Sequence, residues 1–231
     1  MILPKLNPKS RADYSKGSRS RTFPVEGTPW GTIWIRPDLL RQGNRKLHQI
    51  YTFDLSPIRC CINTVSCEST CYALKSDRLY PDVFNSRLIN SFLAWHDPDT
   101  LRALLWESLY KLPKGSVIRP HASGDFFKPH YADLWCDLMT EFTDHTFYTY
   151  TKAPNWPSIG RIDDLHNINL IRSDGPLGGR NFGPLNRVLD FVYLNKGWAI
   201  CPATLQPGIK CNLDCSYCLI KGNCRILFVQ H

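Results

Sequence analysis

Four cysteines near the C-terminal end have the types and spacing of a metal site. Cys201 precedes a proline, and Cys211, Cys215 and Cys218 follow it in a CxxxC and a CxxC arrangement. Thiolates on short loops can converge on one centre without distorting the backbone. A Cys-Pro with an irregular cysteine run favours a [4Fe–4S] cluster over zinc, which usually joins two CxxC pairs. Zinc remains the alternative, and Cys224 can replace Cys211 as the fourth ligand.

A second group of cysteines, Cys60, Cys61, Cys67 and Cys71, lies far upstream. Cys67 and Cys71 are similar to the start of the CxxxCxxC loop of radical S-adenosylmethionine enzymes. Leu74 stands where the third cysteine would be, so a loop that leaves one iron open is absent. Two interpretations remain, a second metal site or thiols that pack or form a redox-sensitive pair.

Polar residues follow a predicted strand over residues 117–121. Arg119, His121 and Ser123 alternate along it, which places them on one face, and Asp125 comes next. A buried arginine or histidine is costly unless it is paired or meets an anion. We therefore weigh two hypotheses equally. In one, His121, Ser123 and Asp125 are catalytic and Arg119 binds a ligand; in the other, all four form a structural network.

Tyr148, Tyr150 and Lys152 alternate in the same way along a predicted strand over residues 146–151. Two phenols followed by an ammonium suit a phosphate-bearing or adenine-bearing ligand, with the tyrosines binding it and Lys152 at the reacting end. The competing interpretation is two core tyrosines followed by a solvated lysine.

The elements that must position these residues alternate between strands and helices. Apolar positions at helical spacing predict three helices, within 83–95, 101–109 and 131–142, and a weaker helix after Pro157. Asp99 is the expected N-cap of the helix over 101–109. The expected strands are residues 50–56, 117–121, 146–151, 168–173, 191–194, 198–201 and 225–231. Such alternation predicts an α/β fold, and we expect a TIM-like (β/α) barrel, complete or lacking one strand, with a C-terminal cysteine-rich metal-binding segment. Cys201 would end a strand at the functional rim, facing Arg119 to Asp125.

Charge and composition bound the function classes. The chain has 231 residues and a net charge of +8, of which residues 1–22 supply +5, six basic residues less Asp13. We expect residues 1–47 to be a flexible basic leader and lead-in, and residues 48–231 to be one domain. No apolar run is long enough for a membrane span and no secretory signal is visible. We therefore expect a cytoplasmic protein with reduced thiols.

Four ordered motifs, CxxxCYA from Cys67, RxHxSGDF from Arg119, FYxYTK from Phe147 and the Cys201-Pro202 run, together resemble the phage gene-product-88 family. The likeness covers residues 48–231 and departs from the family in the CxxxC between Cys211 and Cys215. The resemblance implies a phage or prophage protein in a bacterial cytoplasm, with a barrel-like fold and an Fe–S centre. It implies no established reaction.

The residues and the resemblance together predict an iron–sulfur enzyme acting on a small molecule, with an anionic, nucleotide-bearing substrate preferred. Hydrolysis of a thioester such as acyl-coenzyme A is slightly favoured, with the basic body attracting its phosphates. The alternatives are a radical-S-adenosylmethionine-like or redox enzyme, and a protein without catalysis, either a redox or iron sensor or a structural metal protein. Nucleic acid is not expected as a partner because no recognition-helix pattern is visible, and the sequence gives no oligomeric state.

Overall fold

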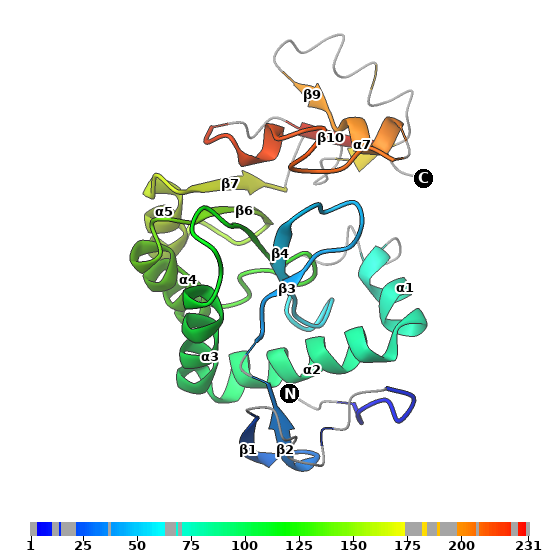
Figure 1. Ribbon diagram of the computed structural model, residues 1–231, viewed down its shortest axis with the longest axis vertical. Coiled ribbons are helices and arrows are strands. Elements are labelled where there is room, and N and C mark those ends of the chain that lie inside the picture. Colours follow the sequence, from blue (N-terminus) through cyan, green and yellow to red (C-terminus); the bar gives the residue numbers. More distant parts are fainter. Residues whose placement is uncertain are drawn as a thin grey trace.

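The protein was analysed as a computed structural model, which describes residues 4–10, 14, 22–36, 38–62, 68, 71–173, 182–183, 189, 198–206, 208–222 and 226–229. A five-stranded sheet in the order β3-β4-β5-β6-β7 lies at its centre (Figure 1). Its strands are β3 (Arg41–Gln42), β4 (Ile50–Phe53), β5 (Val117–Pro120), β6 (Thr146–Thr151) and β7 (Ile168–Arg172). β4 to β7 are parallel, and β3 pairs with β4 in the antiparallel sense.

Helices connect the parallel strands, as the alternation of patterns predicts. They are α1 (Tyr72–Leu79), α2 (Pro81–His96), α3 (Pro98–Tyr110), α4 (Pro129–Glu141), α5 (Pro157–Asp164) and the short α7 (Pro202–Leu205). Apart from α1, each of these begins with a proline, whose fixed φ suits the first helical position and whose missing N–H is not needed there. The cap of α3 is Asp97, whose side chain accepts a hydrogen bond from Thr100 N at 3.1 Å, and not Asp99 as the sequence suggested.

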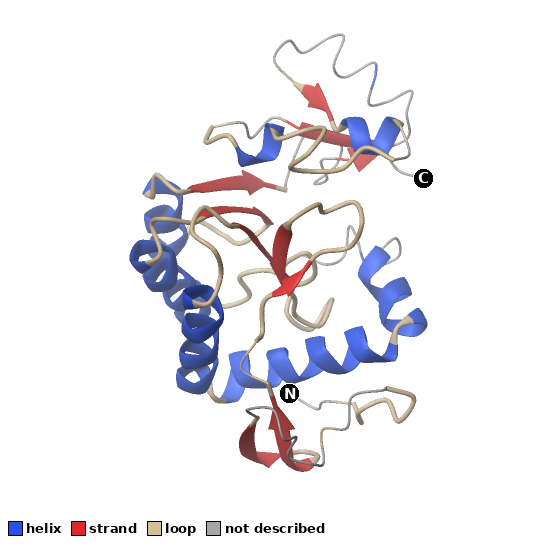
Figure 2. Ribbon diagram, in the orientation of Figure 1, coloured by secondary structure: helices blue, strands red, loops and turns tan. Residues whose placement is uncertain are grey.

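The two faces of the central sheet are covered differently. On one face, Phe53, Ile118 and Phe147 join the main core with residues of α2, α3, α4 and α5. Figure 2 shows these helices along the lower and left sides of the strands. On the other face, Ile50, Val117 and Tyr148 pack against Cys211, Cys218 and Leu219 of the C-terminal segment. The sheet is therefore a middle layer between helices and a cysteine-containing loop.

Two smaller sheets complete the described fold. β1 (Phe23–Thr28) and β2 (Gly31–Ile35) form an antiparallel hairpin within the part expected to be a lead-in. β8 (Phe182–Gly183), β10 (Ile226–Val229) and β9 (Ala199–Ile200) form a parallel sheet in the order β8-β10-β9. The 3₁₀ helix η3 (Tyr217–Leu219) lies in the cysteine loop. The strand expected over 191–194 falls outside the described residues.

The expectation of a TIM-like barrel is wrong. Within the described residues the sheet of β3 to β7 is open, and β8, β9 and β10 pair in a separate sheet instead of continuing it. Alternating strands and helices arise equally in open and closed sheets, so the pattern does not report closure. Two of the three C-terminal strands have only two residues each, which leaves little edge to close a barrel. The described helices include none that is long and apolar enough to cross a membrane.

Candidate metal centre

The C-terminal cysteines gather over the face of the central sheet that the helices leave open. Cys201 is the N-cap residue of α7, and Cys211 forms isolated β-bridges with Leu47 and with Cys215. Cys218 lies in η3 and packs against apolar side chains that also contact Cys211 and Cys201. The four predicted ligands thus come from one continuous stretch that folds back on itself.

Backbone and side-chain hydrogen bonds hold this stretch on the sheet. Cys211 N donates to Lys46 O at 2.8 Å, next to the start of β4. Asn169, in β7, donates from Nδ2 to Cys218 O at 3.0 Å and accepts from Gly222 N at 3.1 Å. The loop is therefore fixed at both edges of the four parallel strands.

The thiols lie close enough to influence one another electrostatically. Burial raises the pKa of Cys211, and the neighbouring Cys201 and Cys215 raise it further, while Lys46 and Arg119 lower it. Burial likewise raises the pKa of Cys218, to about 11, with Cys201 and Cys211 adding to the effect. Without a metal these thiols are protonated near neutral pH, so binding a metal must release protons.

Arg119, Tyr148 and Tyr150 line the sheet below the thiols. The Arg119 guanidinium carbon lies 5.8 Å from the ring centroid of Tyr148 and 5.1 Å from that of Tyr150. The Tyr150 hydroxyl lies 3.0 Å from Cys218 Sγ. Burial raises the pKa of Tyr148 to about 12, and Cys211 and Cys218 raise it too, against the opposing effect of Arg119. The phenols are therefore neutral and can donate hydrogen bonds to sulfur.

The Arg119 cation has no carboxylate within ion-pair distance in the described part of the chain, and its buried Nε has no hydrogen-bond partner. Burial lowers the pKa of Arg119, but Tyr148, Tyr72 and Tyr150 raise it more, so the side chain stays charged. A desolvated cation without a counterion is unfavourable. The position therefore fits an anionic group.

The arrangement has donor side chains suited to a metal, but they are not in coordinating positions. Across the described residues no three histidine, cysteine, aspartate or glutamate side chains stand close enough to hold a metal ion as they are. Four thiols, a nearby arginine whose Nε has no hydrogen-bond partner and a phenol at 3.0 Å from one sulfur fit the chemistry of an anionic thiolate-ligated centre. Cys224 lies outside the described residues.

His121 does not share the surroundings of Arg119. Its φ is +62°, a left-handed conformation that breaks the alternation of the strand. Its Nε2 lies 2.8 Å from the Tyr131 hydroxyl, and Phe126 and Trp135 pack against the ring on the helix side of the sheet. Burial, with a smaller effect of the Arg119 charge, lowers the pKa of His121 to about 3. The expectation that Arg119, His121 and Ser123 lie on one face is wrong.

Ser123 and Asp125 make structural contacts. Ser123 Oγ donates to Leu55 O at 2.9 Å, and Ser123 N donates to Asp54 Oδ1 at 3.0 Å. Asp125 accepts from Thr151 Oγ1 at 2.6 Å and from Lys152 N at 2.8 Å. Burial raises the pKa of Asp125, while hydrogen bonds from Thr151, Lys152 and Phe126 lower it. These contacts join the loops that follow β4, β5 and β6.

The predicted site residues therefore divide into two sets. Arg119, Tyr148 and Tyr150 lie with the C-terminal thiols on the sheet face, whereas His121, Ser123 and Asp125 lie in the helix-side core and the strand-end loops. Lys152 joins the second set through its backbone N–H. The cysteine loop is anchored at Lys46 and Asn169, near the starts of β4 and β7, and not only at the strand ends as expected.

The upstream cysteines have separate surroundings. Cys60 is fully buried and its sulfur accepts a hydrogen bond from Trp95 Nε1 at 3.3 Å. Cys61 Sγ accepts from Ile58 N at 3.3 Å, and burial raises its pKa to about 12. Cys71 is the N-cap residue of α1, and Cys67 lies outside the described residues. Cys60 and Cys61 are therefore packed thiols whose raised pKa values keep them protonated at neutral pH.

Sequence reasoning missed Lys46 and Asn169. Asn169 had a usable signal, because it is a polar residue between apolar ones in the buried part of β7 (Ile168–Arg172). Buried amides in strands usually have a specific hydrogen-bonding task. Lys46 had no such sequence signal, because it lies in a polar loop. Its backbone carbonyl accepts from Cys211 N, and its charge lowers the pKa of Cys211.

The comparison with known proteins rests on the central sheet and its loops. The sequence profile described as gene product 88 matches residues 38–181, more than half of the chain. The chain belongs to the gene product 88 family. The Gene 88 protein of Mycobacterium phage D29 is 29% identical over 124 residues, which are 49% of this chain and 50% of that protein. The match thus spans about half the length of this curated relative, and no solved structure matches.

The family assignment confirms the predicted resemblance and supports a bacteriophage protein. The matched range contains Arg119, His121, Ser123, Asp125, Tyr148, Tyr150 and Lys152. It ends before Cys201, so the gene product 88 profile covers the sheet under the thiols and not the thiols themselves.

Proposed function

We propose that this gene product 88 protein binds a [4Fe–4S] cluster through Cys201, Cys211, Cys215 and Cys218, and that it is a redox-active iron–sulfur protein of the host cytoplasm. Zinc is the alternative metal. The observation that carries the proposal is Arg119, a cation with a buried, unpartnered Nε next to a cluster of thiols. A reducing cytoplasm keeps such thiols free for a metal.

The charges balance if the thiols hold an anionic centre. Arg119 lies over the two tyrosine rings and within electrostatic reach of Cys211 and Cys218. A thiolate-ligated cluster would place negative charge beside this cation, which forms no ion pair within the described residues. The bound cluster would supply one-electron chemistry at a site shielded by the sheet on one side.

The protein's own residues then have distinct tasks. The Tyr150 hydroxyl donates to the Cys218 sulfur, which stabilises the thiolate form. Asn169 fixes the backbone at Cys218 within η3 and at Gly222 after it, so Cys218 keeps its position. Tyr148 and Tyr150 hold the Arg119 guanidinium between the strands and the thiols, where it favours thiolate over thiol.

Hydrolysis of a thioester such as acyl-coenzyme A has less support than redox chemistry. Ser123 donates to a backbone carbonyl, Asp125 is occupied by Thr151 and Lys152, and His121 is bonded to Tyr131. None of these contacts is the pairing of nucleophile and base that such a hydrolase needs. The anionic substrate suggested by Arg119, Tyr148 and Tyr150 remains part of the proposal as a candidate ligand of the same face.

The test is anaerobic purification with quantification of iron and acid-labile sulfide. We expect about four irons and four sulfides per chain and broad absorbance from thiolate-to-iron charge transfer. Cys218→Ser is expected to lower iron content by more than half. Cys136→Ser is the matched control, because Cys136 is a buried cysteine of α4 and should leave iron unchanged.

If the purified protein contains one equivalent of zinc and no sulfide, the site is a zinc site and not an iron–sulfur cluster. Metal-free protein that folds normally after anaerobic preparation and reconstitution would overturn the proposal. A cluster that forms but cannot be reduced or oxidised would leave the structural-metal alternative in its place.

A further inference from the structure

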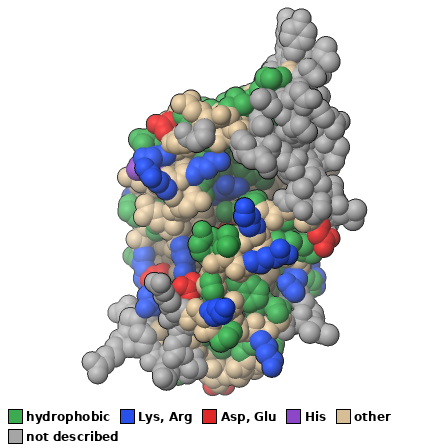
Figure 3. Space-filling view, turned by 90° about the vertical axis from the view of Figure 1, so that its right-hand side faces the viewer, with side chains coloured by type: hydrophobic (Ala, Val, Ile, Leu, Met, Phe, Trp, Pro, Cys, Tyr) green, Lys and Arg blue, Asp and Glu red, His purple; other side chains and the backbone are tan. Residues whose placement is uncertain are grey.

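Basic and apolar side chains share the surface around α1. Tyr72, Leu79 and Tyr80 are 62%, 59% and 58% exposed, unusually high for large apolar residues, and Lys75 and Arg78 lie exposed between them. Figure 3, which views the side of the molecule where α1 lies, shows Lys and Arg side chains around a central hydrophobic group. Acidic side chains are fewer than basic ones in this view.

The only carboxylate of α1 is already neutralised. Asp77 Oδ1 lies 2.6 Å from Arg87 NH1, and Asp54 Oδ2 lies 3.3 Å from Arg87 NH2. These groups are largely buried beneath the helix, so the outer side of α1 carries Lys75 and Arg78 without an acidic partner on the same helix. Glu68, just before α1, is the exposed carboxylate nearest in sequence.

The basic leader is fixed next to this surface. Asn7 N donates to Asn85 Oδ1 at 2.7 Å, and Asn85 Nδ2 donates back to Asn7 O at 3.1 Å, which pins residues 4–10 to the first half of α2. Ser10 Oγ also donates to Asp82. Within residues 4–10 the exposed cations are Lys5 and Lys9, so docking this segment here adds two positive charges to those of α1.

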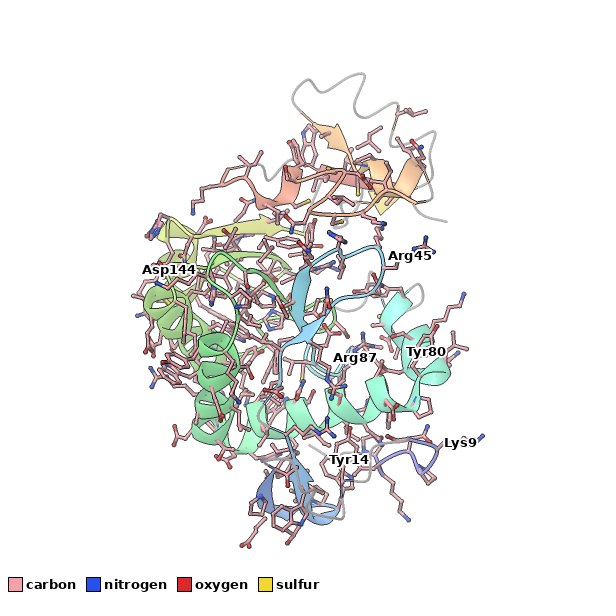
Figure 4. The ribbon with its side chains drawn as sticks, viewed as in Figure 1. Lys9, Tyr14, Arg45, Tyr80, Arg87 and Asp144 are labelled. Carbon is pink, nitrogen blue, oxygen red and sulfur yellow. The ribbon has the colours of Figure 1, made fainter. Side chains whose placement is uncertain are left out.

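The loop between β3 and β4 adds further basic side chains to the same side of the molecule. Arg45 and Lys46 are exposed in this loop. In Figure 4, Arg45, Tyr80 and Lys9 all lie along the right-hand margin, which is the side that faces the viewer in Figure 3. Three segments far apart in the sequence thus place cations on the same side of the molecule as Tyr80, the C-cap residue of α1.

We propose that this α1 surface binds single-stranded nucleic acid, with Tyr72 and Tyr80 stacking on bases and Lys9, Arg45, Lys75 and Arg78 contacting phosphates. Exposed aromatic rings among cations suit a single strand, because the bases of a duplex are stacked inside and cannot reach the rings. The charge alone, most of it in the leader, gave no reason to expect this partner. The docking of the leader beside exposed tyrosines supplies it, independently of any metal.

The test measures binding of the full chain to a fluorescent thymidine oligonucleotide of about 16 nucleotides by anisotropy, over a range of salt. We expect Tyr80→Ala to weaken binding at least about fivefold, and Tyr80→Phe to restore it because the ring is retained. Removing two cations with Lys75→Ala and Arg78→Ala should flatten the slope of log affinity against log salt by about 1.4.

Matched controls lie on α3. Tyr110→Ala removes a tyrosine that is 70% exposed, and Arg102→Ala removes an exposed arginine, so both should leave the affinity unchanged. Equal thermal unfolding of all variants establishes that they fold. No binding, equal losses in the α3 variants, or stronger binding to duplex than to the single strand would overturn the proposal. Binding to anionic lipid vesicles but not to the oligonucleotide would assign the surface to a membrane instead.

Discussion

The surroundings of His121 keep its imidazole neutral at mildly acidic pH, where an ordinary histidine would be protonated. Its ring is enclosed by Phe126, Tyr131 and Trp135, and its Nδ1 is buried without a partner. Trp135 Nε1 donates to the same Tyr131 hydroxyl at 2.8 Å, so this hydroxyl is free to donate to a neutral His121. Protonating the ring would put an uncompensated charge in this cage, near Arg119.

We therefore predict that the protein loses stability as pH falls through the ordinary histidine range. With a folded-state pKa of about 3 against 6.5 when unfolded, His121 binds its proton first in the unfolded chain. Its contribution is complete above pH 6.5 and declines below it, by about 2 kcal/mol at pH 5. Urea unfolding at pH 7 and pH 5 measures this for the protein and for His121→Asn, which tolerates the left-handed φ.

The His121→Asn variant should lose less stability between these two pH values than the unmodified protein. His130→Asn, at an exposed position on α4, is the matched control for the substitution itself. An unchanged dependence in His121→Asn would show that another group titrates.

At the scale of single residues, the alternation expected along the strands holds for some of the selected side chains and fails for others. Arg119, Tyr148 and Tyr150 lie together with the thiols because regular alternation along β5 and β6 holds there. The same rule fails two residues later, because the positive φ of His121 turns its side chain to the helix side. A single non-glycine residue with positive φ has no reliable sequence signature.

At the scale of elements, the loops after β4 and β5 are fitted to each other around Gly124. Leu55 N donates to Ser123 O at 2.9 Å, and Asp125 N donates to Cys60 O at 2.7 Å. Gly124 has φ of +89°, and a Cβ there would lie 2.7 Å from Leu55 Cβ. Both the backbone conformation and the close approach of the two loops require glycine.

We predict that Gly124→Ala destabilises the protein more than Gly115→Ala does. Gly115 also has a positive φ, +77°, but a Cβ there meets nothing within 4 Å. Gly115→Ala should cost about 1 to 2 kcal/mol from conformation alone, and Gly124→Ala about 1 to 3 kcal/mol more from the clash. Urea unfolding of both variants measures the difference in free energy of unfolding. An equal loss of stability in the two variants would mean that the loop at Leu55 moves aside without destabilising the protein.

Most of the helices and strands named below could be predicted from the sequence, but whether the strands close into a barrel could not. α2, α4, β6 and β7 match the periodic segments that predicted them, because apolar spacing reports the local backbone period. Whether the last strands join the first depends on contacts between β8, β9 and β10 and the central sheet, which leave no period in the sequence.

At the scale of the whole molecule, the cysteine loop covers one face of the central sheet as the helices cover the other. The Asn169 side chain in β7 bonds this loop twice, at Cys218 within η3 and at Gly222 after it. Asn167, two residues earlier, does the comparable task for the other layer: its Nδ2 donates to Met139 O at 3.0 Å and Phe142 O at 3.2 Å at the end of α4. The two amides thus anchor opposite layers to one strand.

This symmetry gives a prediction for hydrogen exchange. Asn169→Ala removes two hydrogen bonds from the cysteine loop, so amides of residues 211–222 should exchange about 5 to 150 times faster, which corresponds to about 1 to 3 kcal/mol. Amides of α4 should be unaffected. Asn167→Ala is the matched control and should do the reverse, accelerating exchange at the end of α4 and sparing the loop. If both variants accelerate both regions equally, the layers open together and the cysteine loop is an integral part of the core, not a separately anchored cover.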